Sequence, residues 1–300
     1  MKYPLGILHL FALFAVLAMS CDEKTSNGKT NVVATIFPLY DFARATAKEK
    51  ANITMLVAPG NSVHSFEPSP ADMKKIQNAD VFLYIGGENE TWVKRILSAL
   101  DTSKMKIVRM IDFAKLYKEE DEDDYDEHIW TGPSNAISMI NETANALCEK
   151  DAANCESYRE NAQNYIAQIS ELSGELSQTV NSAKRKLIVV ADRFPFRYLT
   201  EEYGLEYAAA FPGCSDQSNA SAKTIASLIK TVKENKVPYI YHVELSSPKT
   251  AESVAEETGA KMLLLHSYHN LSKQDFEKGL TYLDFLRQNA KNLKTGLWEE

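Results

Sequence analysis

Five histidines lie beyond the apolar N-terminal segment of the chain, and their placement is the first sign of chemistry. His64, His128, His266 and His269 lie in loops or shortly after predicted strands, whereas His242 lies inside one. Neutral imidazole rings gathered in one cleft are the ligands that borderline transition metals such as zinc require. A single loop histidine is most often only a polar surface residue, so the prediction of a metal site depends on the four together. We expect His242 to be buried or to support a ligand.

An acidic run at residues 119–127, EEDEDDYDE, is the second feature able to bind cations. Oxygen-rich flexible loops can hold cations weakly and raise their concentration near a cleft. We therefore interpret the run as a metal-capture loop; the alternative is a solvated loop that only keeps the protein soluble. Its carboxylates belong to Glu119, Glu120, Asp121, Glu122, Asp123, Asp124, Asp126 and Glu127.

Short apolar strands that alternate with amphipathic helices must position these groups. Strands are predicted at residues 32–36, 53–57, 81–85 and 106–110, then at 187–191, 206–210, 239–242 and 262–265. Helices are predicted at residues 40–48, from 70 onward after a Ser69 cap, and at 91–100, 133–148, 196–203, 222–234, 248–258 and 276–293. This alternation predicts an α/β fold of two lobes, each with a four-stranded, mainly parallel sheet flanked by helices. Ligands of such sheets bind beyond the carboxyl ends of the strands.

Between the two sets of strands, residues 154–185 have an apolar stripe at helical spacing. A helix of this length spans about 45 Å, so it would tie the lobes together as one rod. Gly174 is the one interior residue that we expect to soften it. We therefore divide the chain into an N-terminal segment (1–21), a flexible tether (22–30), a first lobe (31–153), the linking helix (154–185) and a second lobe (186–300).

The N-terminal segment has the pattern of a secretory signal: Lys2, then an apolar run, then a small residue before Cys21. This ending resembles the lipobox of bacterial lipoproteins, in which the signal is cut before a cysteine that receives the lipid. Ala18 stands where a leucine is usual, and the alternative is an ordinary signal peptide. Farther along, Cys148 and Cys155 lie seven residues apart and could form a disulfide in an oxidising compartment, or remain two buried thiols.

Several short motifs are spread over nearly the whole mature chain. They are Pro59-Gly60, His64-Ser65-Phe66-Glu67-Pro68-Ser69-Pro70, Asn78-Ala79-Asp80, Gly86-Gly87-Glu88, His128-Ile129-Trp130, Arg193-Phe194-Pro195-Phe196 and Glu256-Glu257-Thr258-Gly259-Ala260. Together they resemble the motifs of the substrate-binding lipoproteins of zinc and manganese ABC transporters, the cluster A-I solute-binding proteins. The resemblance implies two α/β lobes joined by a long backbone helix. It also implies a monomeric, extracytoplasmic, lipid-anchored receptor that captures Zn²⁺ between the lobes and delivers it to a permease with its ATPase.

The resemblance also implies a set of ligands. His64 and His128 match the two metal histidines of the first lobe, and His269 best matches the fourth ligand of the family, usually Asp or Glu. The third family histidine is replaced by Ala191 in this chain, which leaves a vacancy that His266 could fill. Asp192 and Glu244 are weaker candidates. A histidine-dominated set favours zinc over Mn²⁺, which prefers more oxygen ligands.

We therefore expect a receptor and not an enzyme. The chain has no HExxH pair and no nucleophile elbow, which disfavours a zinc hydrolase with His64 and His128 around a catalytic water. The sequence is also compatible with a manganese or iron receptor, with an adhesin, or with a binder of siderophores or cobalamin. The formal net charge is −8 and no basic stripe is present, which argues against a nucleic-acid partner.

Overall fold

The computed structural model describes residues 28–118, 125–211, 213 and 220–299. The predicted signal and lipidated Cys21, most of the tether, and Glu119 to Asp124 of the acidic run lie outside the described residues. Within the described part, no helix has both the length and the apolar character needed to cross a membrane.

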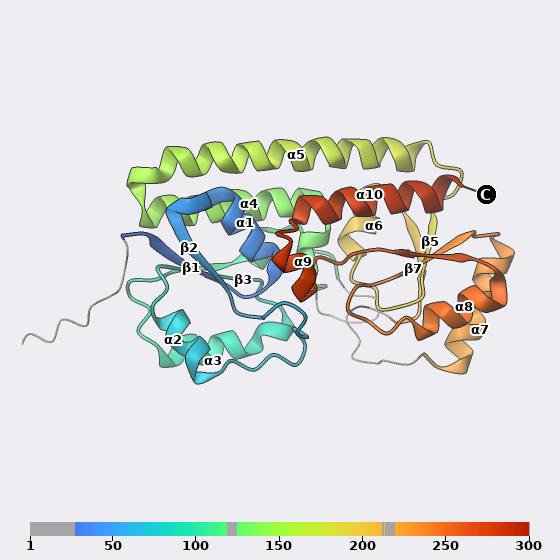
Figure 1. Ribbon diagram of the computed structural model, residues 1–300, viewed down its shortest axis with the longest axis horizontal. Coiled ribbons are helices and arrows are strands. Elements are labelled where there is room, and N and C mark those ends of the chain that lie inside the picture. Colours follow the sequence, from blue (N-terminus) through green and yellow to red (C-terminus); the bar gives the residue numbers. More distant parts are fainter. Residues whose placement is uncertain (1–27, 119–124, 212, 214–219, 300) are drawn as a thin grey trace, which may run out of the picture.

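Two parallel four-stranded sheets lie side by side, each flanked by helices, which confirms the predicted α/β fold (Figure 1). The first sheet has the order β2-β1-β3-β4 and the second the order β6-β5-β7-β8, so the second half repeats the first. The strands are β1 (Thr30–Ala34), β2 (Ala51–Met55), β3 (Val81–Tyr84), β4 (Lys106–Arg109), β5 (Leu187–Val190), β6 (Glu206–Ala209), β7 (Tyr239–His242) and β8 (Lys261–Leu264). The strand order reverses between β1 and β3 and between β5 and β7, where open α/β sheets form their ligand crevices.

Three helices have ends at the caps that the sequence indicates. Ser69 and Asp72 form a capping box at the start of α2, and Gly204 and Gly259 adopt φ of 65° and 75° just past the ends of α6 and α8. The helix bounds are α1 (Phe37–Ala47), α2 (Pro70–Gln77), α3 (Thr91–Ala99), α4 (Pro133–Lys150), α6 (Arg197–Tyr203), α7 (Ala222–Glu234), α8 (Lys249–Thr258) and α9 (Lys273–Glu277).

The linking helix α5 (Cys155–Asn181) contributes to the cores of both lobes. Tyr158 and Ile169 pack in the core of the first lobe, and Leu176 and Val180 pack in the core of the second. Because one continuous helix is buried at both ends, neither lobe can rotate freely about it. The structure therefore gives this rod a packing role as well as a connecting one.

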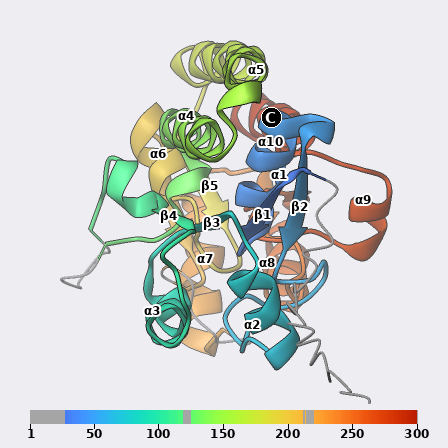
Figure 2. The same cartoon turned by 90° about the vertical axis from the view of Figure 1, so that its left-hand side faces the viewer.

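A second helix, α10 (Tyr282–Trp298), runs beside α5, and the sequence did not predict that this helix would span both lobes. The sequence predicts one helix at 276–293, but Gly279, with φ of 71°, separates α9 from α10. A capping box between Thr281 and Asp284 then starts α10. Phe285 packs in the first core and Leu293 in the second, so α10 also ties the lobes together (Figures 1 and 2). The division at residues 153 and 186 stays a prediction.

Cys148 and Cys155 form a disulfide where α4 ends and α5 begins, with Cα atoms 4.4 Å apart. Of the two states that the sequence left open, the structure has the disulfide and not two thiols.

Candidate metal centre

Three of the predicted histidines converge between the lobes. His64 follows β2, His128 follows the acidic run, and His269 follows β8. The ring centroid of His269 lies 5.5 Å from that of His64 and 5.6 Å from that of His128, with both ring pairs nearly perpendicular. Zinc-bound imidazoles have Zn–N distances of about 2.0–2.1 Å, which places ring centroids around one tetrahedral ion roughly 5 Å apart. The three rings are therefore close to the spacing that one zinc ion requires.

The positions seen here are not yet those of a closed coordination shell. Among the described residues, no three His, Cys, Asp or Glu side chains stand close enough to hold a metal ion together. The donor set still fits the chemistry of zinc, because the three side chains are imidazoles from loops that face one another.

The protonation of His269 suits metal binding. Desolvation lowers the pKa of His269 well below its usual value, and the nearby His128 and His64 lower it further. The ring is therefore neutral near pH 7, and the neutral form is the one that donates a lone pair to a metal.

Hydrogen bonds set the orientation of the two N-terminal rings. His64 Nδ1 lies 3.0 Å from Asn89 Oδ1, and His128 Nδ1 lies 2.8 Å from Asp126 Oδ1. Both partners are acceptors, so each Nδ1 carries the proton and each Nε2 carries the lone pair. The sequence analysis did not identify Asn89 as the partner of His64. The partner of His128 had a signal in the sequence, because the carboxylate Asp126 lies only two residues before it.

The end of the acidic run is not a solvated capture loop. Asp126 and Glu127 are only 3% and 8% exposed, and both accept hydrogen bonds beside the histidines. Buried carboxylates with fixed partners cannot sample solvent for cations, so the capture prediction is wrong for these two residues. For the other six acids, which lie outside the described residues, it stays a prediction.

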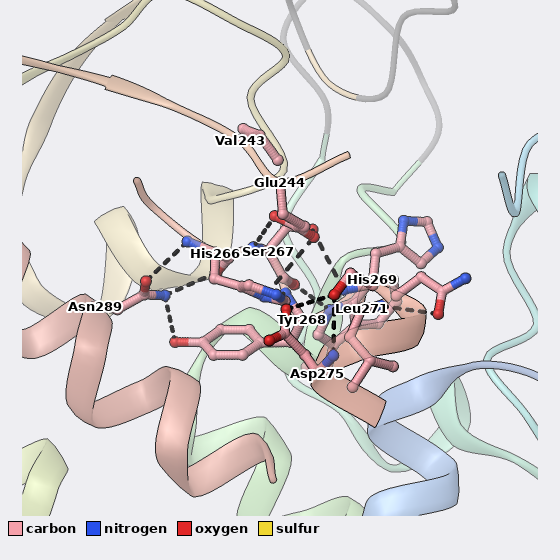
Figure 3. A network of polar contacts seen from close by, with 12 residues as sticks. Val243, Glu244, His266, Ser267, Tyr268, His269, Leu271, Asp275 and Asn289 are labelled. Carbon is pink, nitrogen blue, oxygen red and sulfur yellow. Dashed lines mark hydrogen bonds and ion pairs between the residues drawn. The ribbon is translucent and has the colours of Figure 1, made fainter. Parts of the chain in front are cut away.

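His266 is buried in the second lobe, with its Nδ1 3.8 Å from Glu244 Oε1. Its ring stacks on Phe285 with centroids 3.7 Å apart, and its Nδ1 accepts a hydrogen bond of 2.9 Å from the backbone N–H of Tyr268. Burial lowers the pKa of His266 to about 3. Tyr268 has φ of 61°, which turns the chain between His266 and His269. The Nδ1 lone pair of His266 is therefore engaged within its own loop, and its ring packs on Phe285, so it is not placed as a ligand beside His269 (Figure 3).

Among the described residues of the second lobe, Glu244 is the carboxylate that lines the cleft. Glu244 accepts hydrogen bonds from Ser267 N at 2.8 Å and from Ser267 Oγ at 2.5 Å, and burial raises its pKa to about 7 (Figure 3). A cleft of about 210 Å³ is lined by Glu244 together with His64, His269 and Arg193. Glu244 is therefore the candidate oxygen donor that shares this cleft with His64 and His269.

Asp192 and His242 are not positioned as ligands. The Asp192 carboxylate accepts hydrogen bonds from Arg193 N, Val243 N and Ser246 Oγ, which ties the loops after β5 and β7 together. His242 is the partly buried last residue of β7 and does not line the cleft. Ala191, at the vacant ligand position, is 1% exposed and offers no donor.

Hydrogen bonds across the lobes hold the ligand loops together. Trp130 Nε1 donates to Ser267 O at 2.8 Å, and the ring of Trp130 lies 4.8 Å from that of His269. Asn270 Nδ2 donates to Ala58 O and Asn61 O, in the loop that carries His64. The site is therefore assembled by direct contacts between loops of opposite lobes.

The chain is similar to known zinc-uptake proteins. A family model described as "Zinc-uptake complex component A periplasmic" matches residues 32–296. The zinc-binding lipoprotein AdcA of Streptococcus pneumoniae is 32% identical over 306 residues, which cover 98% of this chain and 60% of that protein. The high-affinity zinc uptake system protein ZnuA of Bacillus subtilis is 30% identical over 312 residues, 97% of each.

The chain is also similar in structure to a solved zinc-binding protein. The crystal structure of the Zn(II)-bound ZnuA-like domain of S. pneumoniae AdcA has a TM-score of 0.79 and 32% identity, over 90% of this chain and 99% of that domain. The chain thus spans about 60% of the length of the streptococcal relative. With a family model matched over residues 32–296 and a zinc-bound structural neighbour, the chain belongs to the family of periplasmic zinc-uptake component A proteins.

Proposed function

We propose that the protein is the extracytoplasmic receptor of an ABC importer, which captures Zn²⁺ between its two lobes and delivers it to a permease with its ATPase. The observation that carries this proposal is the convergence of His64 and His128 with His269 at centroid distances of 5.5 and 5.6 Å. The named relatives, a zinc-binding lipoprotein and a zinc uptake protein, support zinc as the cargo.

The ligand set in this proposal is His64, His128 and His269, with Glu244 as the fourth donor. Small rotations of the rings would close the gap to the spacing of a tetrahedral site. Glu244 would leave Ser267 and supply the oxygen that compensates for Ala191. Three nitrogens and one oxygen favour zinc over manganese, because manganese prefers a shell of more oxygen ligands.

The location follows from two features. A Cys148–Cys155 disulfide suits an oxidising compartment outside the cytoplasm. Cys21, after the signal-like segment, would carry the lipid, and the segment from Asp22 up to the start of β1 at Thr30 would tether a monomeric receptor to the membrane.

Metal titration tests the proposal. Metal-free protein should bind zinc more tightly than manganese, and His64→Ala, His128→Ala and His269→Ala should each weaken zinc binding strongly. Binding of neither metal would refute the receptor, and tighter manganese binding would favour a manganese receptor. Zinc-dependent ester or peptide hydrolysis that His64→Ala abolishes would favour the hydrolase.

A further inference from the structure

A chain of polar groups extends from His64 into the first lobe. Asn89, in the short 3-10 turn Glu88–Glu90, places Oδ1 3.0 Å from His64 Nδ1. On its other side, Asn89 Nδ2 donates to Glu127 Oε1, and the backbone N–H of Asn89 donates to Glu127 Oε2 at 3.2 Å. Three side chains from separate segments thus form one line.

The carboxylate decides the direction of every bond in this line. In its ionised form Glu127 can only accept from the Asn89 amide, so Nδ2 faces Glu127 and Oδ1 faces His64. An amide oxygen only accepts, so His64 Nδ1 must be the donor. The neutral ring is then held as the Nδ1–H form, and its Nε2 carries the lone pair.

Gly87 gives Glu127 the space that it occupies. A Cβ atom at Gly87 would overlap the Cβ, Cδ and Oε2 atoms of Glu127. The backbone of Gly87, with φ of −83° and ψ of −171°, is one that any residue can adopt. Glycine is therefore required here by the side chain of Glu127 and not by the backbone.

We propose that Glu127, acting through Asn89, is a positioning residue that fixes the tautomer and the orientation of His64 for zinc capture. This inference rests on the proposed function for the identity of the cargo. Asp126 does the same for His128 by direct contact at 2.8 Å. Adjacent residues at the end of the acidic run thus orient both N-terminal histidines, a role distinct from cation capture.

The first test is the tautomer of His64 in metal-free wild-type protein. Long-range ¹H–¹⁵N spectra of the imidazoles distinguish Nδ1–H from Nε2–H. We expect the Nδ1–H form for His64 in wild type, and a shift toward Nε2–H in Asn89→Ala. Glu127→Ala removes the acceptor that orients the Asn89 amide and should also lose the fixed Nδ1–H form. An Nε2–H form in the wild type, or no change in Asn89→Ala, would overturn the proposal.

The second test is zinc affinity by competition with a chelator. Loss of a group that orients a metal ligand typically weakens binding by about 10–100-fold, and we expect this for Asn89→Ala and Gly87→Ala. Gly174→Ala is the matched control, because a Cβ there meets nothing within 4 Å. Unchanged affinity in both Asn89→Ala and Gly87→Ala would contradict the proposal.

Failure of the two hypotheses can be told apart. If the wild type binds no zinc but shows the Nδ1–H form, the proposed function fails while the hydrogen-bonded line stands. Circular dichroism identifies any variant that does not fold, and the wild-type spectrum then still decides the question.

Discussion

On the N-terminal side of the candidate metal centre, His64 and His128 are each held through Nδ1, by Asn89 and by Asp126. On the C-terminal side, His269 lies in a loop and the carboxylate of Glu244 is bound to Ser267. The position after β5, where relatives of this kind were expected to have a histidine, is Ala191.

The two sides differ in how far their side chains are already oriented for metal binding in the metal-free protein. Imidazoles with a fixed tautomer need little reorganisation to bind zinc. Glu244, in contrast, must release its hydrogen bonds and its proton, since its pKa of about 7 lies well above that of an exposed carboxyl. We infer that the first lobe is the preorganised half and that the second lobe responds to the metal.

The largest effect is expected from His128→Ala. It removes a buried, oriented side chain of the proposed ligand set, and the loss of affinity should exceed the roughly 10–100-fold range of supporting groups. We expect zinc affinity to fall by more than about 100-fold in competition assays. If His128→Ala bound zinc with nearly wild-type affinity, His128 would not be a ligand, and the first lobe would not be the preorganised half.

Glu244→Gln should change how stability depends on pH. The pKa of Glu244 is about 7 in the folded protein and about 4.5 when exposed, so its contribution is fully present below pH 4.5 and is lost as the pH rises through 7. The metal-free variant should therefore gain up to about 3 kcal/mol over wild type between pH 4.5 and 8, measured by urea unfolding. A difference that does not vary with pH would contradict this.

Glu90 on the N-terminal side is the matched control for Glu244. It is buried as well, and its pKa is also raised to about 7. Glu90→Gln should show the same trend with pH but leave zinc affinity unchanged, whereas Glu244→Gln should also weaken zinc binding. Equal zinc affinity in both variants would exclude Glu244 as the fourth donor.

His266→Ala should separate stability from binding. It removes the stacking on Phe285 and the acceptor for Tyr268 N–H, which together should cost about 2 kcal/mol of unfolding free energy. Zinc affinity should stay close to wild type in isothermal titration. If the variant folded stably but did not bind zinc, His266 would have to be counted among the zinc ligands.

The smallest effect is expected from Gly174→Ala, in the linking helix between the halves. A Cβ there meets no other atom within 4 Å, so alanine should stabilise α5 by about 1 kcal/mol. Because α5 and α10 both pack in the two cores, we expect only small lobe movements and unchanged zinc affinity. A large compaction in solution scattering on adding zinc would contradict a stiff connection.

Much of the fold could be predicted because its signals are local. Short β-branched runs gave each of the eight strands to within two residues at either end. Ser69, Gly204 and Gly259 marked helix ends because capping depends on residues within one turn. His64 after β2 and His269 after β8 each follow the carboxyl end of a strand, which is where parallel sheets bind their ligands.

The sequence alone therefore determined the two α/β lobes and the histidines that could meet between them. Only the tertiary structure decided between His266 and His269, which are three residues apart, because packing on Phe285 in α10 and the turn at Tyr268 direct one ring into the core and the other toward the cleft. It also decided that Asp126 and Glu127 are buried supports. Side-chain direction in a loop depends on distant neighbours, and no local pattern records them.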